Sequence, residues 1–230
     1  MKPSIKICGI CNQADALLAV NQGAQYLGLI FVQSSPRFIE TTAARLIAQA
    51  VNYQAKIVGV FQNSTIDEIN NVLDFVDLDY IQLHGNESPK FCAGLSKPVI
   101  KSFQINTENI SSKQPCITLS YKNKHFDSTD LDLLKQYGPH CSHFLFDKVK
   151  NESSDNWLDL ATRALKSIED QLGQYFFSGG LNPQNVKTVL QKLNPATLDV
   201  ASGVEQTNRE KSKVLMKEFF NSVSNPKEKP

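Results

Sequence analysis

The side chains that could take part in catalysis or binding lie at the ends of short apolar runs along this chain. They include a thiol, a guanidinium, an imidazole and two carboxylates, together with two turns rich in small residues. Side chains of these types can transfer protons and bind an anionic ligand. No G-x-G-x-x-G or G-x-x-x-x-G-K-[ST] motif is present, so nucleotide binding is not supported. The candidates are Cys8, Arg37, Gln62, His84, Ser102, Asp147, Gly179-Gly180, Asp199 and Ser202-Gly203.

The segment from 175 to 205 predicts a phosphate site, beginning with its first loop. Tyr175–Phe177 is an aromatic run typical of a buried parallel strand. Ser178-Gly179-Gly180 follows it and lets backbone amides approach a ligand closely. A helix is expected next, with Asn182 as its cap and Pro183 at its first position.

A second loop of the same kind follows the next strand. The strand is predicted over Thr197–Val200, and Ala201-Ser202-Gly203 comes directly after it. Two strand-end loops that open onto helix N-termini make a concavity suited to an anion. We therefore assign Gly179, Gly180, Ser202 and Gly203 to phosphate binding.

Cys8 is the thiol among the candidates, and the strand period places it on the same face as Lys6. A neighbouring lysine and a following helix N-terminus both favour the thiolate. By itself, a cysteine in a strand is more often an inert buried side chain. Cys8 and Cys11 also form C-G-I-C, a motif of redox proteins, but that motif opens a helix in a much smaller fold. No second pair completes a zinc site, and we expect no metal.

The elements that must position these residues alternate between strand and helix. Helices are expected between most strands, for example after a cap at Asn12, over Thr41–Val51 and after a cap at Ser64 or Thr65. This alternation implies a parallel sheet, and eight units close most economically as a (β/α)₈ TIM barrel with ligands at the strand C-termini. The eight predicted strands are Ile5–Cys8, Tyr26–Val32, Lys56–Phe61, Tyr80–His84, Val99–Phe103, Phe144–Asp147, Tyr175–Phe177 and Thr197–Val200.

One region departs from this regular pattern. Between Gln104 and Ser142 we predict an elaborated connection between strands 5 and 6, with an extra strand over Cys116–Ser120 and a helix over Leu131–Tyr137. The predicted domain is a single barrel over 1–221, followed by a polar tail over 222–230.

Composition restricts the classes of partner. The 230 residues carry 24 Lys+Arg against 23 Asp+Glu, a net charge of +1, so we expect neither a nucleic acid nor a membrane as partner. No apolar run approaches the roughly 20 residues needed to span a bilayer. The five cysteines are odd in number and scattered, which favours reduced thiols and a cytoplasmic location. We expect a monomer or a homodimer.

Seven short motifs, in order over most of the chain, resemble one enzyme family. The chain is similar to the phosphoribosylanthranilate isomerases, and the seven pieces together are far more specific than any one alone. They are KICGI at 6–10, SPR at 35–37, GVF at 59–61, QLHG at 82–85, FD at 146–147, SGGLNPQNV at 178–186 and DVASGVE at 199–205.

The resemblance implies a function and roles for individual residues. It implies a tryptophan-pathway isomerase that performs an Amadori rearrangement on a phosphosugar substrate, without cofactor or metal. Cys8 would be the general base and Asp147 the general acid. Arg37 would bind the anthranilate carboxylate, and we assign His84 and Asp199 to substrate binding. Asp199 has two alternative roles, which are to tune Asp147 or to shape the eighth loop.

The sequence departs from the family pattern at three places. KVKNESSDNW after Asp147 lacks the usual glycine run, Ala201-Ser202-Gly203 replaces Ser-Ser-Gly, and QTNREKS replaces Pro-Gly-x-Lys-Asp. Weaker substrate binding is therefore expected rather than altered chemistry. Two alternatives stay open, which are another phosphosugar isomerase on the same scaffold and a non-catalytic phosphosugar-binding barrel.

Overall fold

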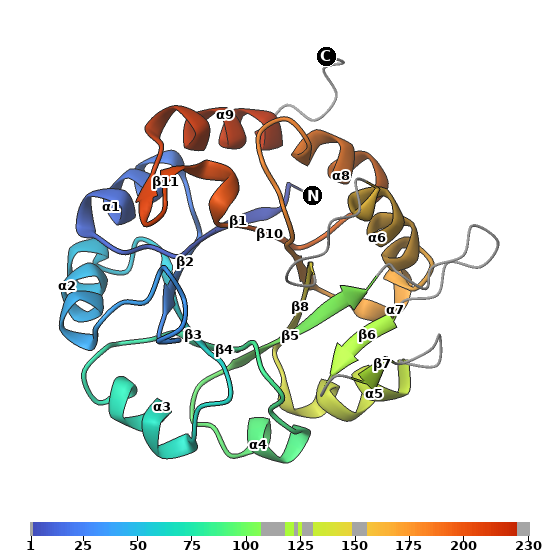
Figure 1. Ribbon diagram of the computed structural model, residues 1–230, viewed down its shortest axis with the longest axis horizontal. Helices are drawn as coiled ribbons and strands as arrows, with labels where there is room; N and C mark the ends of the chain where they lie inside the picture. Colours follow the sequence, from blue (N-terminus) through green and yellow to red (C-terminus); the bar gives the residue numbers. More distant parts are fainter. Residues whose placement is uncertain (1, 107–117, 122–123, 126–130, 149–155, 225–230) are drawn as a thin grey trace.

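The computed structural model describes residues 2–106, 118–121, 124–125, 131–148 and 156–224. Eight parallel strands close into a barrel, seen end-on in Figure 1, because the first strand pairs with the last and the fourth pairs with the fifth. The predicted (β/α)₈ barrel is confirmed. In order around the barrel the strands are β1 Ser4–Cys8, β2 Tyr26–Ile30, β3 Lys56–Phe61, β4 Tyr80–Leu83, β5 Val99–Asn106, β8 His143–Lys148, β9 Tyr175–Phe177 and β10 Thr197–Val200.

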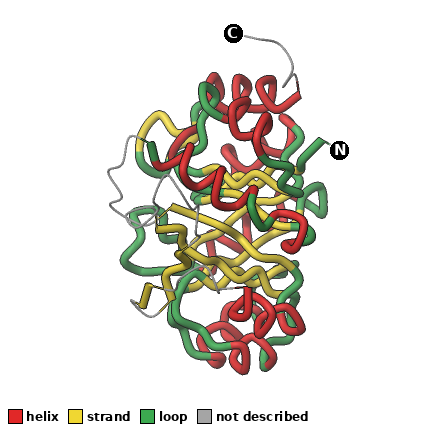
Figure 2. The backbone as a smooth tube through the Cα atoms, turned by 90° about the vertical axis from the view of Figure 1, so that its right-hand side faces the viewer, coloured by secondary structure: helices red, strands yellow, loops and turns green. Residues whose placement is uncertain are grey.

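Helices cover the outside of the barrel, and Figure 2 shows them on either side of the tilted strands. Short 3₁₀ turns lie at Gly138–His140 and Ser202–Val204. The α-helices are α1 Gln13–Gln22, α2 Thr41–Val51, α3 Ile66–Leu73, α4 Pro89–Ala93, α5 Leu131–Tyr137, α6 Trp157–Lys166, α7 Glu169–Leu172, α8 Val186–Lys192 and α9 Lys213–Ser224.

Two helix caps predicted from the sequence are confirmed, and one is wrong. Asn12 accepts from the Asp15 amide at the start of α1, and Thr65 forms a capping box at α3. Helix α8 begins at Val186, three residues beyond the predicted start. Asn182 instead closes a turn, since its Oδ1 accepts from the amides of the second and third residues after it at 2.9 and 3.0 Å.

The connection between β5 and β8 carries the predicted elaboration. β5 runs three residues beyond its expected end, and β6 Thr118–Tyr121 pairs with it antiparallel. β7 Lys124–His125 pairs in turn with β6 and extends outward from the barrel (Figure 1). The helix predicted over Leu131–Tyr137 is confirmed as α5. The first two residues of the predicted extra strand, 116 and 117, lie outside the described residues.

Four aromatic side chains fill the barrel interior where its strands begin. Tyr26 contacts Tyr80 and Phe176 edge-to-face, with ring centroids 5.9 and 5.3 Å apart. His143 completes the set, at 6.0 Å from Tyr80 and 5.3 Å from Phe176. These residues come from β2, β4, β8 and β9, so their rings meet across the interior. The barrel is packed at this end, and ligand chemistry belongs to the opposite end.

A buried ion pair joins the loops that follow β3 and β4. Lys101 is fully buried, and its Nζ donates to Glu87 Oε2 at 2.9 Å and to the Gly85 carbonyl at 2.6 Å. Glu87 is also buried, and its carboxylate accepts from the amides of Asn63 and Gly85 at 2.7 and 3.0 Å. Each charge therefore has a charged partner and further hydrogen bonds, as burial demands.

Replacing Lys101 by methionine is expected to cost about 3–5 kcal/mol of unfolding free energy, because the Glu87 carboxylate would stay buried without its cation. Urea unfolding measures this loss. Lys97→Met is the matched control, since Lys97 pairs with Asp77 at 3.7 Å on the surface and should matter by less than about 1 kcal/mol. Equal losses in the two variants would contradict the importance of the buried pair.

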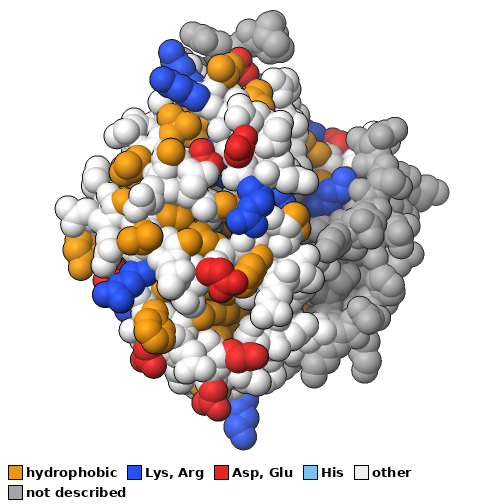
Figure 3. All heavy atoms as spheres, turned by 60° about the vertical axis from the view of Figure 1, so that its left-hand side comes forward, with side chains coloured by type: hydrophobic (Ala, Val, Ile, Leu, Met, Phe, Trp, Pro, Cys, Tyr) orange, Lys and Arg blue, Asp and Glu red, His pale blue; other side chains and the backbone are white. Residues whose placement is uncertain are grey.

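The last helix extends into the predicted polar tail. α9 continues through Ser224, so residues 222–224 of the expected tail are helical. On the face shown in Figure 3, basic and acidic side chains lie interspersed. Among the described residues, no helix combines the length and apolar character needed to cross a membrane.

Candidate active site

Four titratable side chains predicted from the sequence lie together at the C-terminal end of the barrel. Cys8 ends β1, Asp199 lies on the adjacent β10, Asp147 lies on β8 and His84 directly follows β4. Asp199 is close enough to interact electrostatically with each of the other three. The structure therefore brings the thiol, the imidazole and both carboxylates into one cluster.

Cys8 and Lys6 point to the same side of β1, as the strand period predicted. A Cβ added to Gly28 on the neighbouring strand would lie 2.8 Å from Cys8 Sγ and 3.1 Å from Lys6 Nζ. Real Cβ atoms do not approach a sulfur so closely, so the glycine provides the room that the thiol occupies. Cys8 is 8% exposed and Lys6 is fully buried.

Lys6 favours the Cys8 thiolate as expected, but burial of the thiol outweighs this effect. Burial raises the pKa of the Cys8 thiol, while Lys6 acts in the opposite direction and Asp199 adds to the increase. Lys6 cannot offset burial because its charge is already matched by Asp199. Burial therefore favours the protonated thiol over the thiolate.

Asp199 is engaged by Lys6 through both carboxylate oxygens, each 3.0 Å from Nζ. Burial raises the pKa of Asp199, with Lys6 opposing and Asp147 adding to the increase. For Lys6, burial lowers the pKa, but the attraction of Asp199 outweighs it and the pKa is raised. The predicted substrate-binding Asp199 is thus only 4% exposed and lies beneath the cluster as half of an ion pair.

Asp147 and His84 are the more accessible members of the cluster. Their side chains are 23% and 24% exposed, and His84 Nε2 lies 3.7 Å from Asp147 Oδ2. This separation is too long for a hydrogen bond. Asp147 Oδ1 accepts from the amide of Lys148 at 2.8 Å, which orients the carboxylate and leaves Oδ2 toward His84. Both groups can therefore reach a ligand in the mouth.

The two predicted phosphate loops lie side by side. Gly179 and Gly180 have φ values of +104° and +66°, a region that favours glycine. A Cβ at Gly180 would meet nothing within 4 Å, whereas one at Gly203 would lie 1.8 Å from the Leu181 carbonyl oxygen. Ser202 begins the 3₁₀ turn that contains Gly203. The loops after β9 and β10 therefore touch at Gly203, and Gly180 faces open space.

Arg37 reaches the mouth from the loop after β2 but is paired inside the protein. Its Nε and Nη2 donate to the two oxygens of Glu205 at 2.7 and 2.6 Å. Burial raises the pKa of Glu205, but the hydrogen bonds from Arg37 and Lys211 outweigh burial and lower it. Sequence reasoning assigned no role to Glu205 or Lys211. A signal was present, because Glu205 ends the DVASGVE motif and a lysine follows it within the altered QTNREKS segment.

Two buried oxygen atoms on the interior strands have no hydrogen-bond partner among the described residues. They are Oε1 of Gln82, which is 2% exposed, and Oγ of Ser102, which is 7% exposed. Ser102 was among the predicted strand-end residues, and Gln82 lies two residues before His84 on the same face of β4. Buried polar atoms in native proteins are normally paired, so these two are suited to contact a ligand.

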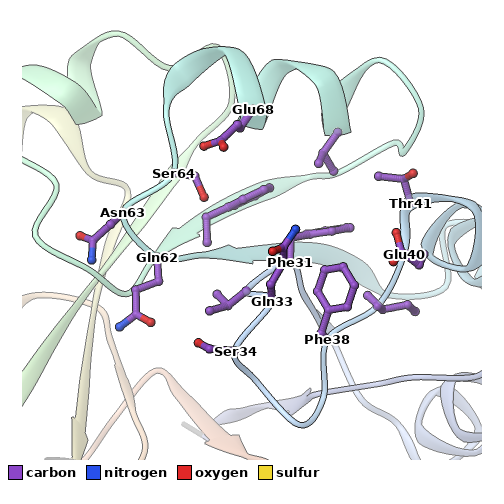
Figure 4. Close-up of a pocket in the computed structure, with 14 residues that line it drawn as sticks. Phe31, Gln33, Ser34, Phe38, Glu40, Thr41, Gln62, Asn63, Ser64 and Glu68 are labelled. Carbon is purple, nitrogen blue, oxygen red and sulfur yellow. The ribbon is translucent and has the colours of Figure 1, made fainter.

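A cavity of about 560 Å³ lies apart from this cluster, between the loops that follow β2 and β3 (Figure 4). The rings of Phe31 and Phe61 stack at 5.2 Å beside it, and Phe38 points into it. Gln62, a predicted strand-end residue, lines this cavity rather than joining the cluster, and its Nε2 donates to the His84 carbonyl at 3.4 Å.

The CxxC hypothesis receives no support from the geometry. Cys8 and Cys11 are both free thiols, and Cys11 Sγ donates to the carbonyls of Gly9 and Arg37 at 3.6 Å. In the part of the chain that the structure describes, no group of three or more His, Cys, Asp or Glu side chains is arranged to hold a metal ion.

Comparisons with known proteins show which family the chain resembles. The family model described as N-(5'phosphoribosyl)anthranilate (PRA) isomerase matches residues 5–129 and 106–222. The N-(5'-phosphoribosyl)anthranilate isomerase of Pelobacter propionicus is 34% identical over 216 residues, which cover 94% of this chain and 93% of the relative.

Solved structures agree with the sequence comparison. The phosphoribosyl anthranilate isomerase of Thermotoga maritima has a TM-score of 0.81 at 28% identity, covering 97% of this chain and 99% of its own. A phosphoribosyl anthranilate isomerase in complex with reduced 1-(o-carboxyphenylamino)-1-deoxyribulose 5-phosphate has a TM-score of 0.78 with the same identity and coverage. The chain therefore belongs to the N-(5'-phosphoribosyl)anthranilate isomerase family.

Proposed function

We propose that this isomerase converts N-(5-phosphoribosyl)anthranilate to 1-(2-carboxyphenylamino)-1-deoxyribulose 5-phosphate, with Cys8 as general base and Asp147 as general acid. The observation that carries the proposal is the placement of this thiol and this carboxylic acid at one barrel mouth, on β1 and β8, beside two phosphate-type loops. The family relationship supports the same reaction, one step of tryptophan biosynthesis.

The acid step opens the sugar ring. Asp147 in its protonated form donates to the furanose oxygen, the bond from that oxygen to C1′ breaks, and the nitrogen lone pair forms a protonated Schiff base at C1′. The accessible Oδ2 of Asp147 is the atom suited to this transfer, because Oδ1 is held by the Lys148 amide. His84 lies beside Oδ2 and can contact the hydroxyl that forms.

The base step moves the double bond. Cys8 removes the proton from C2′, which the cationic Schiff base has acidified, and the resulting enolamine becomes the ketone product when C1′ gains a proton and the C2′ hydroxyl loses one. Burial raises the pKa of Cys8, so the thiolate needs a nearby positive charge. The Schiff-base cation supplies that charge beside Sγ.

Substrate binding is divided between the two ends of the ligand. The open position at Gly180, with Gly179, Ser202 and Gly203 around it, suits the ribose phosphate. Arg37 is assigned to the anthranilate carboxylate. Gln82 and Ser102 are suited to the sugar hydroxyls, since a hydroxyl donated to either unpartnered oxygen would satisfy it. Asp199 acts through Lys6 rather than by touching the substrate.

The test follows the fluorescence of freshly prepared phosphoribosylanthranilate after addition of purified protein. Rapid loss of fluorescence, with product identified by mass spectrometry, is the expected result. Binding without turnover would favour the non-catalytic phosphosugar-binding barrel instead. Turnover of other aminosugar phosphates but not of this one would favour a different isomerase.

Replacing Gly203 by alanine is expected to raise KM about tenfold, equivalent to roughly 1.4 kcal/mol of binding free energy, with a smaller effect on kcat. The added Cβ would collide with the Leu181 carbonyl and push the two phosphate loops apart. Steady-state kinetics, with inorganic phosphate as competitor, measures the change. Gly138→Ala is the control, because a Cβ there meets nothing within 4 Å. An unchanged KM would remove phosphate binding from this loop pair.

We also propose that the enzyme acts in the cytoplasm on a small phosphosugar, as a monomer or homodimer. Among the described residues, the free thiols of Cys8, Cys11, Cys92 and Cys141 support a reducing compartment. Light scattering on the purified protein measures the oligomeric state.

A further inference from the structure

A short hairpin after β10 contacts the loop that carries Arg37 at several points. The hairpin consists of β11 Glu205–Thr207 and β12 Glu210–Lys211, which pair antiparallel. We call residues 205–211 the Arg37 hairpin. Its residues 206–211 belong to the QTNREKS segment, where the sequence departs from the family pattern, and Glu205 ends the matching DVASGVE motif. Glu205 and Arg209 make these contacts, and Lys211 joins the hairpin to the ends of β1 and β10.

Glu205 holds the Arg37 side chain by one edge. The carboxylate accepts from Nε and Nη2, which together form the side edge of the guanidinium. A guanidinium has five N–H donors, and this arrangement leaves the end edge, formed by Nη1 and the second N–H of Nη2, for another acceptor. A planar carboxylate can fork onto that end edge. Glu205 thus orients Arg37 without consuming the donors that a ligand would need.

Arg209 holds the backbone on both sides of Arg37. Its Nη1 donates to the carbonyls of Pro36 and Phe38 at 3.1 and 2.9 Å. Its φ of +76° is uncommon for a side chain other than glycine, and it lies at the turn of the hairpin. The loop after β2 is therefore fixed from the hairpin at two carbonyl groups and one side chain.

Lys211 connects the hairpin to the catalytic cluster. Its buried Nζ donates to Glu205 Oε1 at 2.8 Å, to the Cys8 carbonyl at 2.7 Å and to the Ala201 carbonyl at 3.1 Å. These two carbonyls lie at the ends of β1 and β10. Lys211 also balances the charge of Glu205, so the group formed by Arg37, Glu205 and Lys211 keeps one net positive charge for an anionic ligand.

The stem of Arg37 packs directly against the residue after the thiol. A Cβ added to Gly9 would lie 2.4 Å from Arg37 Cδ, so the arginine crosses the backbone at the end of β1. The contact with Gly9 therefore fixes the position of the Arg37 guanidinium relative to the Cys8 thiol.

We propose that the Arg37 hairpin sets the substrate specificity of this enzyme by presenting the end edge of Arg37 to the carboxylate of the aromatic amine. Glu205 and Arg209 are positioning residues in this account, since they act through Arg37 and do not touch the substrate. The inference rests on the proposed binding of the anthranilate carboxylate by Arg37. It goes beyond that role by assigning carboxylate selectivity to a segment outside the strand-end residues.

The experiment compares two substrates, phosphoribosylanthranilate and the aniline analogue that lacks the carboxylate, by chromatographic assay of the products. Glu205→Gln should lower kcat/KM roughly 10- to 100-fold for the carboxylate substrate, because a charge-assisted pair on Arg37 is lost. For the aniline analogue it should change kcat/KM by less than about threefold. Arg209→Met, an exposed position, should reduce the preference in the same direction by roughly 3- to 10-fold.

Controls separate this inference from a general effect on folding and from the proposed function. Glu210→Gln makes the same charge change on the same hairpin, where the side chain contacts Gln206 and Thr207, and should leave the preference unchanged. Equal losses for both substrates in Glu205→Gln would overturn the inference, because the hairpin would then only support the fold. An unaltered preference in Arg37→Met would also overturn it. A wild-type protein inactive on both substrates would instead reject the proposed function.

Discussion

Replacing Cys8 by alanine is expected to lower kcat by about 10²–10⁴-fold, the usual contribution of one general base. The sulfur lies in the mouth beside Lys6 and Asp199, and alanine leaves no group there that can accept the C2′ proton. The fold should persist, because the deleted atom is one sulfur at the rim of the barrel. Steady-state kinetics and urea unfolding measure the two effects separately.

The pH dependence of Cys8 reactivity tests whether the pKa of this thiol is raised. Burial raises the pKa of Cys8, so the deprotonated fraction keeps growing above the ordinary thiol value of about 8.5. The rate at which iodoacetamide alkylates Cys8, followed on the Cys8 peptide by mass spectrometry, depends on the thiolate and should rise with pH across this range and level off only beyond it. Cys92→Ala removes another buried thiol, on α4, and should leave the profile unchanged. A plateau at neutral pH would contradict the raised pKa.

Replacing Asp147 by asparagine is expected to lower kcat by about 10²–10⁴-fold as well. The amide has nearly the same shape and can still donate a hydrogen bond, but it cannot transfer a proton to the ring oxygen. Asp132→Asn, at an exposed carboxylate on α5, serves as the control for the same substitution. Full activity in Asp147→Asn would remove Asp147 from the acid step.

The kinetic isotope effect with substrate deuterated at C2′ distinguishes loss of the general acid from loss of the general base. In Asp147→Asn the ring opening should limit turnover, so the isotope effect on kcat should approach unity. In Cys8→Ser, where removal of the C2′ proton is slow, a full isotope effect is expected. The reverse pattern would exchange the roles of the two residues.

The fold followed from local patterns because each strand and helix signal is carried by neighbouring residues. The apolar runs predicted all eight barrel strands, and Asn12 and Thr65 cap their helices as expected. Asn182 was misassigned because an asparagine before proline can close a turn as well as cap a helix. The extension of β5 depends on pairing with β6, a tertiary contact that periodicity does not encode.

The site was predictable in its residue types but not in its pairings. Lys6 and Asp199 are 193 positions apart in sequence, so nothing local indicated that each neutralises the other. From the sequence alone, Lys6 was therefore expected to favour a Cys8 thiolate. Burial, which decides the pKa of Cys8, is likewise a property of the assembled barrel. Lys211 was missed for the same reason, since its three acceptors lie on three separate segments.

The four aromatic side chains at the start of the strands also limit where a ligand can enter and leave the barrel. Tyr26, Tyr80, His143 and Phe176 seal the barrel axis behind the Lys6–Asp199 pair, so a ligand has no exit on that side. The substrate must therefore enter, and the product leave, through the same opening at the C-terminal end of the barrel. The next substrate can bind only after the product has left, so substrate and product compete for the enzyme.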